Sequence, residues 1–140
     1  MGLTIYILGI LLGIGLTLIL TTFLQFCYFS LKHKEIMNSL KKEVKENHSI
    51  ASKNLELYEK NRLEAYKPFL IKSYKQFIIN TPADTIDKKK MNSLLNGYIF
   101  AEEFNKKMIN PEGFQEIVND KVILNQIKES LKSFLKENKD

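Results

Sequence analysis

Residues 3–29 read LTIYILGILLGIGLTLILTTFLQFCYF, a run without any charged side chain. A helix needs about 20 apolar residues to cross the hydrocarbon core of a bilayer, at a rise of about 1.5 Å per residue. The run is long enough to cross with some tilt, whereas the chain after Lys32 is lysine-rich and polar. The sequence therefore predicts an all-α protein with a transmembrane anchor at 1–30, a juxtamembrane helical stalk at 31–54 and a cytoplasmic helical domain, a small bundle, at 55–140.

The run is predicted to be a retained anchor, with a cleaved signal peptide as the alternative. Signal peptides begin with a positively charged region, carry an apolar run of about 7–15 residues and end in small residues. Here residues 2–5 have no charged side chain, and the run ends in the bulky stretch from Gln25 to Phe29. Both features favour an anchor that stays in the membrane.

The orientation of the anchor follows from the lysines beside it. Positive residues close to a span remain in the cytoplasm, and no charged side chain precedes the span to balance them. We therefore expect the N-terminus outside the inner (plasma) membrane and the domain in the cytoplasm. Anionic lipid headgroups attract basic residues at about 1 kcal/mol each. Headgroup contact is expected for Lys32, Lys34, Lys41 and Lys42.

The basic charge is concentrated near the membrane rather than spread along the chain. Residues 30–80 hold ten lysines and one arginine against six glutamates. Nucleic-acid binding is the competing interpretation of a basic protein. Phosphate recognition favours arginine and interleaved aromatic side chains, and Arg62 is the only arginine. Lipid proximity is therefore favoured, and no nucleic-acid partner is expected.

A stripe of small and polar side chains recurs every fourth residue within the span. Side chains four apart lie on one face of a helix. The spacing GxxxG allows close approach of two membrane helices, and hydroxyls or an amide can bond across such an interface. We expect the span to associate with itself or with a membrane protein partner through this stripe, against the alternative that glycine is simply common in membrane helices. The stripe consists of Gly9, Gly13, Thr17, Thr21 and Gln25.

Residues 31–67 contain neither glycine nor proline before Pro68 and are predicted to form one helix. Asn47, Asn54 and Asn61 share a heptad position. Three amides in one seam are too polar for a stable dimeric coiled coil, although buried asparagine can set register. A solvated stalk over 41–54 is therefore favoured, and a weak parallel coiled coil remains open if the span dimerises.

One apolar segment after Pro68 is predicted to form the centre of the domain. Proline removes a backbone donor and clashes with the preceding turn, so Pro68 should kink the helix or begin a new one. Residues 69–79 are strongly apolar and are predicted to be the core helix, with Phe77 buried. The helical spacing of apolar residues becomes clear from Leu55 onward, so the compact domain is predicted to begin at that residue.

Two further helices are predicted from their caps and periodicity. Asp84 or Thr85 should cap a helix that runs to about Met108. Gly97 lies inside this helix and marks a close crossing with another helix, because glycine otherwise weakens a helix. Asn110, followed directly by proline, should cap the last helical segment.

No catalytic, cofactor or metal signature is found, and the protein is expected not to be an enzyme. Phosphate-binding, dinucleotide-binding, nucleophile-elbow and zinc-protease motifs are all absent from the sequence. His33 and His48 stand fifteen residues apart on the polar stalk. Metal-binding histidines usually have a second ligand three to five residues away. Both histidines are expected to be solvated, and no cofactor is expected.

Residues 57–66, LYEKNRLEAY, lie where the charged helix enters the domain. This stretch and the general layout resemble uncharacterised small bacterial single-span membrane proteins with a cytoplasmic helical domain. The Arg62 to Tyr66 portion, Arg-Leu-Glu-Ala-Tyr, carries the resemblance. It implies a bacterial inner-membrane protein and transfers no functional residues.

The function expected from the sequence is that of a membrane-anchored, non-enzymatic helical interaction module. Its cytoplasmic domain would be presented to protein partners. Two alternatives stay open. The protein is a small accessory subunit of a larger membrane complex, with the stripe packed on another subunit, or a membrane-acting phage or toxin-like effector that oligomerises through its span.

Overall fold

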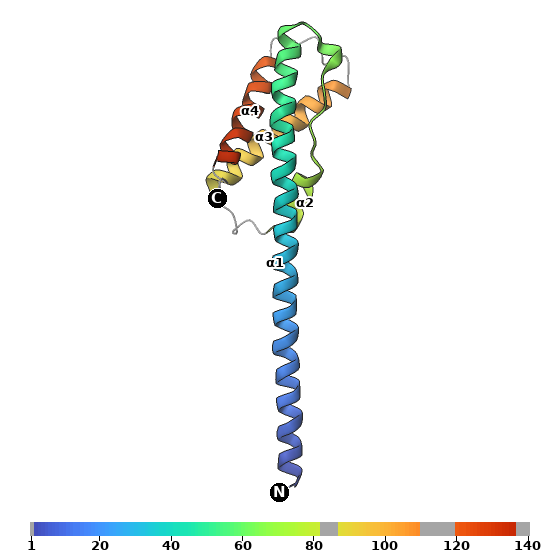
Figure 1. The fold of residues 1–140 in the computed structure, drawn as a ribbon, viewed down its shortest axis with the longest axis vertical. Coiled ribbons are helices and arrows are strands. Elements are labelled where there is room, and N and C mark those ends of the chain that lie inside the picture. Colours follow the sequence, from blue (N-terminus) through green and yellow to red (C-terminus); the bar gives the residue numbers. More distant parts are fainter. Residues whose placement is uncertain (1, 82–86, 110–119, 137–140) are drawn as a thin grey trace. The chain divides into compact units, whose positions relative to one another are not determined.

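The computed structural model describes residues 2–81, 87–109 and 120–136. These residues form the helices α1 (Gly2–Glu59), α2 (Lys72–Asn80), α3 (Lys88–Ile109) and α4 (Asp120–Lys136), with the short 3-10 helix η1 (Leu63–Ala65) between the first two (Figure 1). The all-α prediction is confirmed for this described part of the chain, which contains no strand. The chain divides into two compact units, residues 1–35 and 36–140, and each is described by itself.

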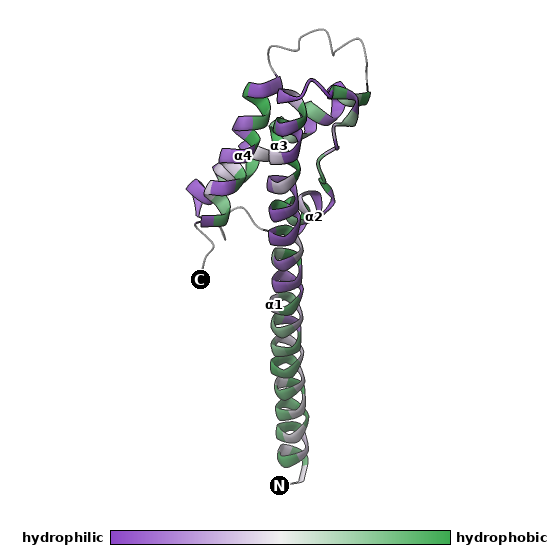
Figure 2. Ribbon diagram, turned by 45° about the horizontal axis from the view of Figure 1, so that its top comes forward, coloured by the Kyte–Doolittle hydropathy of each residue, from purple (hydrophilic) through white to green (hydrophobic). Residues whose placement is uncertain are grey.

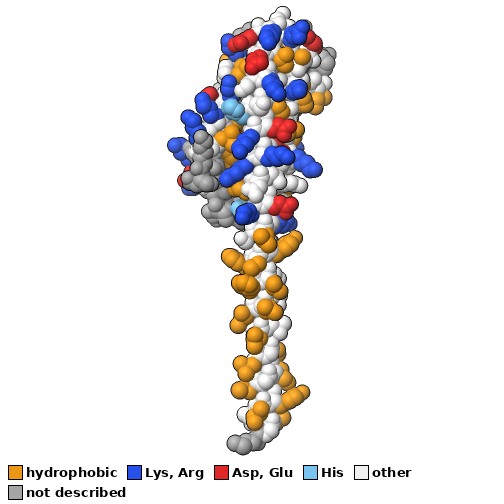
Figure 3. Space-filling view, viewed as in Figure 1, with side chains coloured by type: hydrophobic (Ala, Val, Ile, Leu, Met, Phe, Trp, Pro, Cys, Tyr) orange, Lys and Arg blue, Asp and Glu red, His pale blue; other side chains and the backbone are white. Residues whose placement is uncertain are grey.

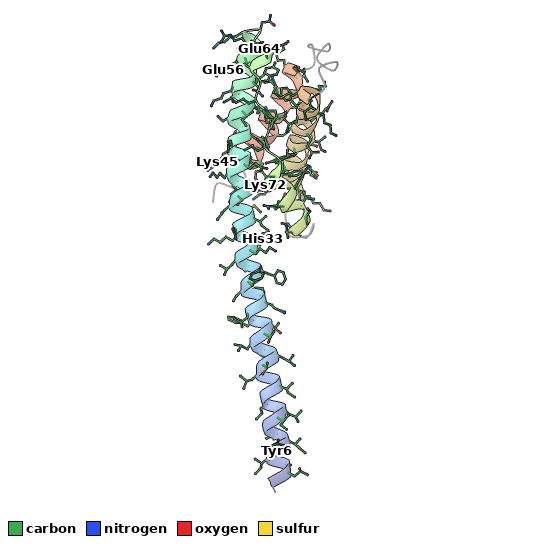
Figure 4. The ribbon with its side chains drawn as sticks, turned by 90° about the vertical axis from the view of Figure 1, so that its right-hand side faces the viewer. Tyr6, His33, Lys45, Glu56, Glu64 and Lys72 are labelled. Atoms are coloured by element: carbon green, nitrogen blue, oxygen red, sulfur yellow. The ribbon has the colours of Figure 1, made fainter. Side chains whose placement is uncertain are left out.

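The first unit consists of the N-terminal part of α1. Its large apolar side chains between Leu3 and Leu31 are 47–74% exposed. Figure 2 colours most of this stretch as hydrophobic, and Figure 3 shows no charged side chain on its visible face. Figure 4 labels Tyr6 and His33 near its two ends. Among the described residues, α1 is the helix long and apolar enough to cross a membrane. That finding is one of length and composition.

The second unit has a hydrophobic core between the remainder of α1 and the other three helices. α3 and α4 pack closely against each other. The core also takes in two aromatic residues that precede α2, Tyr66 and Phe69. The large, fully buried apolar side chains include Tyr98, Phe77, Phe104, Leu40, Leu94 and Leu124.

Hydrogen bonds set the direction of the chain that follows α1. Asn54 pairs with Lys67, and Asn47 pairs with Leu70. Further back along α1, Glu43 accepts a bond from the Ser73 backbone. Because the partners on α1 run backward as the chain runs forward, the segment leading into α2 is antiparallel to α1.

The remaining two helices take opposite directions. Asn105 bonds to Phe69, and Tyr98 stacks on Tyr74, so α3 runs antiparallel to the segment entering α2 and parallel to α1. α4 then returns along α3 in the opposite direction. Figures 1 and 2 show α3 and α4 side by side in this arrangement.

The prediction of a solvated stalk over 41–54 is wrong. Leu40, Val44 and Ala51 are completely buried, and Asn47 and Asn54 are buried with them. One face of α1 is covered by the other helices, so this part of α1 belongs to the core of the second unit. The asparagines that made the seam look polar have backbone partners, which removes the penalty for burying an amide.

The predicted helix over 31–67 ends earlier, at Glu59. Asn61 has a positive φ of 54°, a conformation that asparagine tolerates better than most residues. The Asn61 N–H donates to Tyr58 O at 3.0 Å, and the Arg62 N–H donates to Leu57 O at 2.9 Å. This pair of bonds is the Schellman motif, which satisfies the last helical carbonyls and stops α1.

Pro68 neither kinks a helix nor begins one. Residues 66–71 leave the 3-10 helix as an extended segment, and α2 begins only at Lys72. Phe69 is buried from that extended segment rather than from a helix, whereas Phe77 is fully buried on α2 as predicted. The core helix predicted over 69–79 is therefore correct in its second part only.

An aspartate caps the start of α3, and a glycine lies where α3 crosses α4. The Asp87 carboxylate accepts bonds from the Lys89 N–H at 2.8 Å and the Lys90 N–H at 3.3 Å, so Asp87 caps α3. A Cβ on Gly97 would lie 2.8 Å from Leu131 Cδ2, which confirms a close helix crossing at this glycine. The caps predicted at Asp84, Thr85 and Asn110 lie outside the described residues.

Candidate functional site: an asparagine clamp

An extended segment, residues 66–71, is held by side chains from two helices, and we call it the clamped segment. Its Tyr66 and Phe69 side chains point into the core and are 6% and 3% exposed. Lys67, Pro68 and Leu70 are exposed. The segment therefore buries two aromatic rings while most of its other side chains face solvent.

Three asparagines bind the backbone of the clamped segment, and together they form the asparagine clamp. Asn54 donates to Lys67 O at 2.8 Å and accepts from Lys67 N at 3.0 Å. Asn47 makes the same pair with the Leu70 backbone, at 2.7 and 2.8 Å.

The third asparagine acts from the other side. Asn105 on α3 donates to Phe69 O and accepts from Phe69 N, both at 2.8 Å. An amide side chain carries both a donor and an acceptor, as does each residue of an extended backbone. The clamp therefore satisfies the segment as a neighbouring β-strand would. Pro68 has no N–H group, so its nitrogen needs no hydrogen-bond acceptor.

Glu43 continues the clamp to the start of α2. Its carboxylate accepts bonds from Ser73 N at 2.7 Å, Tyr74 N at 3.0 Å and the Tyr98 hydroxyl at 2.8 Å. A negative group at a helix N-terminus is stabilised by the free N–H groups there. Burial raises the pKa of the Tyr98 hydroxyl above its ordinary value, and the neighbouring Glu43 charge raises it further. The hydroxyl therefore stays protonated and remains a donor.

A small cavity of about 200 Å³ opens beside Glu43. Sites for drug-sized molecules usually measure about 300–1,000 Å³. The acceptors of Glu43 are also engaged by three donors. The arrangement therefore holds the chain in place rather than presenting a free base. The cavity is lined by Ser39, Lys42, Glu43, Glu46, Leu70 and Ser73.

His48 is only partly exposed, so the expectation that it is solvated is wrong. Its Nε2 atom is buried and has no hydrogen-bond partner among the described residues. Burial lowers the pKa of His48 below 6.5, and Lys128 and Lys132 on α4 lower it further against an opposing effect of Glu129. In the part of the chain that the structure describes, no three His, Cys, Asp or Glu side chains gather as a metal site.

The predicted membrane-packing stripe lies on the first unit. A Cβ on Gly9 or Gly13 would meet nothing within 4 Å, so this face of α1 is open. The Thr17 hydroxyl donates to Gly13 O at 2.8 Å, and the Thr21 hydroxyl donates to Thr17 O at 2.7 Å. Gln25 is exposed. The hydroxyl donors are thus used within α1, which leaves their oxygens to accept bonds from a partner.

The predicted lipid-contact lysines are divided between the two units. Lys32 and Lys34 lie on the first unit and are exposed. Lys41 and Lys42 lie on the second, where Lys41 is half-buried and Lys42 is exposed at the rim of the cavity. The headgroup contact stays a prediction for all four.

Sequence reasoning identified two members of the clamp without recognising their role. Asn47 and Asn54 stand seven residues apart, two helical turns, on a stretch without breakers. This spacing placed both amides on one face, and a proline-containing stretch follows that can supply an extended backbone. Glu43 and Asn105 had no comparable signal, because their roles depend on the return of the chain beside α1.

Comparison with known protein families, with curated proteins and with solved structures finds no match to this chain.

Proposed function

We propose that this protein is a membrane-anchored, non-enzymatic helical interaction module. Its first unit crosses the inner (plasma) membrane with the N-terminus outside, and its second unit is presented to protein partners in the cytoplasm. The observation that carries this proposal is the apolar surface of α1, whose large side chains from Leu3 to Leu31 are 47–74% exposed.

This surface needs a cover. Burying apolar surface is favourable by about 25 cal/mol per Å², and soluble monomers rarely expose apolar patches above a few hundred Å². The stretch is also long enough to span the hydrocarbon core. A bilayer covers it without any further partner, and the lysines that follow it favour a cytoplasmic second unit.

The hydrogen bonds made by the polar side chains of the second unit support an interaction role. Asn47, Asn54, Asn105 and Glu43 all bond to the chain itself. These side chains use their hydrogen bonds to hold an irregular part of the backbone in place. This suits a rigid binding domain rather than a catalytic site. The partner would then meet a preformed surface, which lowers the entropy lost on binding.

Membrane extraction and a topology reporter test the anchor. The full chain should remain in the membrane pellet after alkaline carbonate washing, and a chain lacking residues 1–30 should not. A reporter active only in the cytoplasm should work when fused after Asp140. Release of the full chain by carbonate, or activity of a periplasmic reporter at Asp140, contradicts the proposal. Capture of interacting proteins from native membranes then identifies the partner.

An accessory subunit or a homo-oligomer is the second candidate, and the open stripe of α1 favours it. Gly13→Leu places a side chain on the stripe, where it should hold two packed helices apart. Gly15→Leu is the matched control, because Gly15 lies off the stripe and is also open within 4 Å. A reporter of transmembrane association should respond to the first change and not to the second. An equal response, or none to either, contradicts packing through this stripe.

A further inference from the structure

We propose that one end of the second unit docks on the surface of an anionic lipid bilayer. The docking face, which we call the basal face, comprises Ile78, Ile79, Lys88, Lys90 and Lys136. This inference rests on the proposed membrane anchor and goes beyond it, because the anchor alone would leave the second unit free to move above the bilayer.

The helix directions bring these residues to the end of the unit where the chain enters at Ile36. Ser73 contacts Glu43, and α2 runs back along α1, so Ile79 lies about 9 Å further toward Ile36. Tyr98 also contacts Glu43, and Lys88 lies ten residues before it on a helix parallel to α1. Because α3 is inclined to α1 (Figure 1), Lys88 lies at most about 15 Å toward the same end.

The fourth helix ends at the same place. Leu131 lies against Gly97, and α4 runs antiparallel to α3, so Lys136 lies toward the start of α3. In Figures 1 and 2 the end of α2, the start of α3 and the end of α4 gather where α1 enters the second unit. The ends of three helices therefore contribute to one face.

The start of α3 carries an unusual charge pattern. Lys88, Lys89 and Lys90 occupy its first turn, and this turn contains no acidic residue. The N-terminal end of a helix is electropositive, so cations there are disfavoured. The Asp87 carboxylate precedes them and caps the backbone. An anionic surface would add to the stabilisation that the Asp87 carboxylate already gives this end of α3.

Exposed isoleucines accompany these lysines. Ile79 is 81% exposed and Ile78 is 42% exposed, both on the last turn of α2. Apolar side chains beside lysines are typical of elements that lie in the membrane interface, where the lysines meet headgroups and the apolar groups enter the acyl boundary. Asp87 accompanies these lysines at the start of α3, whereas Glu56 and Glu64, labelled in Figure 4, lie at the opposite end of the unit.

The short connection between the span and the second unit favours lipid over a protein as the partner of the basal face. Only four residues, 32–35, separate Leu31 from Ile36, so five Cα–Cα steps join the two. An extended chain covers at most about 3.6 Å per residue, so Ile36 stays within about 18 Å of the polar end of the span. A bilayer surface is therefore always present near the basal face. The cations are lysines, which act on headgroups as point charges and need no bidentate partner.

Fluorescence quenching in lipid nanodiscs tests the inference on the full chain. A label on Asn80→Cys, in a Cys27→Ser background, reports contact with lipids that carry a quencher on the headgroup. One disc contains phosphatidylcholine alone, and the other contains about one-third phosphatidylglycerol, whose negative surface attracts lysines. Quenching should be stronger in the anionic disc and should weaken as salt shortens the screening length.

Matched variants locate the contact. Lys88→Gln with Lys90→Gln should lower the docked-to-undocked ratio about fivefold per lysine, the factor given by roughly 1 kcal/mol for each basic residue. Ile79→Ser should also lower it. Lys106→Gln with Lys121→Gln removes the same charge from the opposite end and should leave quenching unchanged. Circular dichroism checks that each variant is folded.

The outcomes separate this inference from the anchor. Equal quenching in the two discs, or an equal loss in both lysine pairs, overturns docking by the basal face. Protein that enters the discs and shows no quenching leaves the anchor intact and refutes the docking alone. Protein that does not enter the discs refutes the anchor, and the docking with it.

Discussion

Replacing Asn47 with alanine should release the clamped segment from α1 at Leu70. The Asn47 side chain is completely buried. It donates to Leu70 O at 2.7 Å and accepts from Leu70 N at 2.8 Å. Alanine removes both bonds and leaves two backbone groups facing an apolar methyl group.

The magnitude follows from the two bonds and their surroundings. An intramolecular hydrogen bond contributes about 0.5–1.5 kcal/mol net, and a buried polar group left without a partner costs about 1–3 kcal/mol. Leu70 is 39% exposed, so water can reach part of its backbone and reduce the second contribution. We expect Asn47→Ala to lower the free energy of unfolding by about 2–4 kcal/mol.

Two comparison variants isolate the amide. Asn47→Asp keeps an acceptor for Leu70 N but turns a negative oxygen toward Leu70 O, so it should destabilise at least as much as alanine. Asn38→Ala changes an exposed asparagine on the same helix and should stay within about 0.5 kcal/mol, as surface changes usually do. Adding Asn54→Ala to Asn47→Ala should cost less than the sum, because both hold one segment.

Urea titration of the full chain in mild detergent measures these differences. Tyrosine fluorescence can follow the second unit, because the chain has no tryptophan and four of its six tyrosines, Tyr58, Tyr66, Tyr74 and Tyr98, lie in that unit. A loss below about 0.5 kcal/mol for Asn47→Ala, no larger than for the exposed control, would refute the clamp as a source of stability.

Burial of α1 beyond the span predicts that residues 36–140 fold without it, whereas residues 55–140 do not. Circular dichroism tests both fragments, and a cooperatively melting 55–140 fragment contradicts the prediction. Gly97→Leu should lower the free energy of unfolding by about 1–3 kcal/mol or more through overpacking, since a Cβ alone would lie 2.8 Å from Leu131; the same urea titration measures it, and an unchanged midpoint argues against the crossing. The lowered pKa of His48 predicts that stability falls as pH drops below 6.5, and His48→Gln should remove part of this fall.

Acid should lower the stability of the protein through proton binding at His48. A lowered pKa in the folded state means that the unfolded chain binds more protons below pH 6.5, so acid favours unfolding there. Burial raises the pKa of Asp120 above 3.8, which acts in the opposite direction at lower pH. The original chain and His48→Gln share Asp120, so urea titrations of both at about pH 8 and about pH 5 isolate the histidine. An identical pH response in the two contradicts the assignment.

Several elements were predictable because their signals are local. The uncharged run at residues 3–29 is long and apolar, whatever the rest of the chain does. The apolar stretch over residues 69–79 predicted that Phe77 is buried, and its side chain is fully buried. Gly97 predicted a crossing because an interior glycine weakens a helix unless close packing compensates.

The tertiary structure decided the role of the chain between residues 41 and 71. Asn47 and Asn54 looked suited to solvent because an amide without a partner is costly to bury. Each partner is a backbone group 13 or 23 residues away, and its position depends on the turn at Asn61 and the return of the chain. Whether an amide faces water or the core is therefore set by contacts distant in sequence, which residue periodicity does not encode.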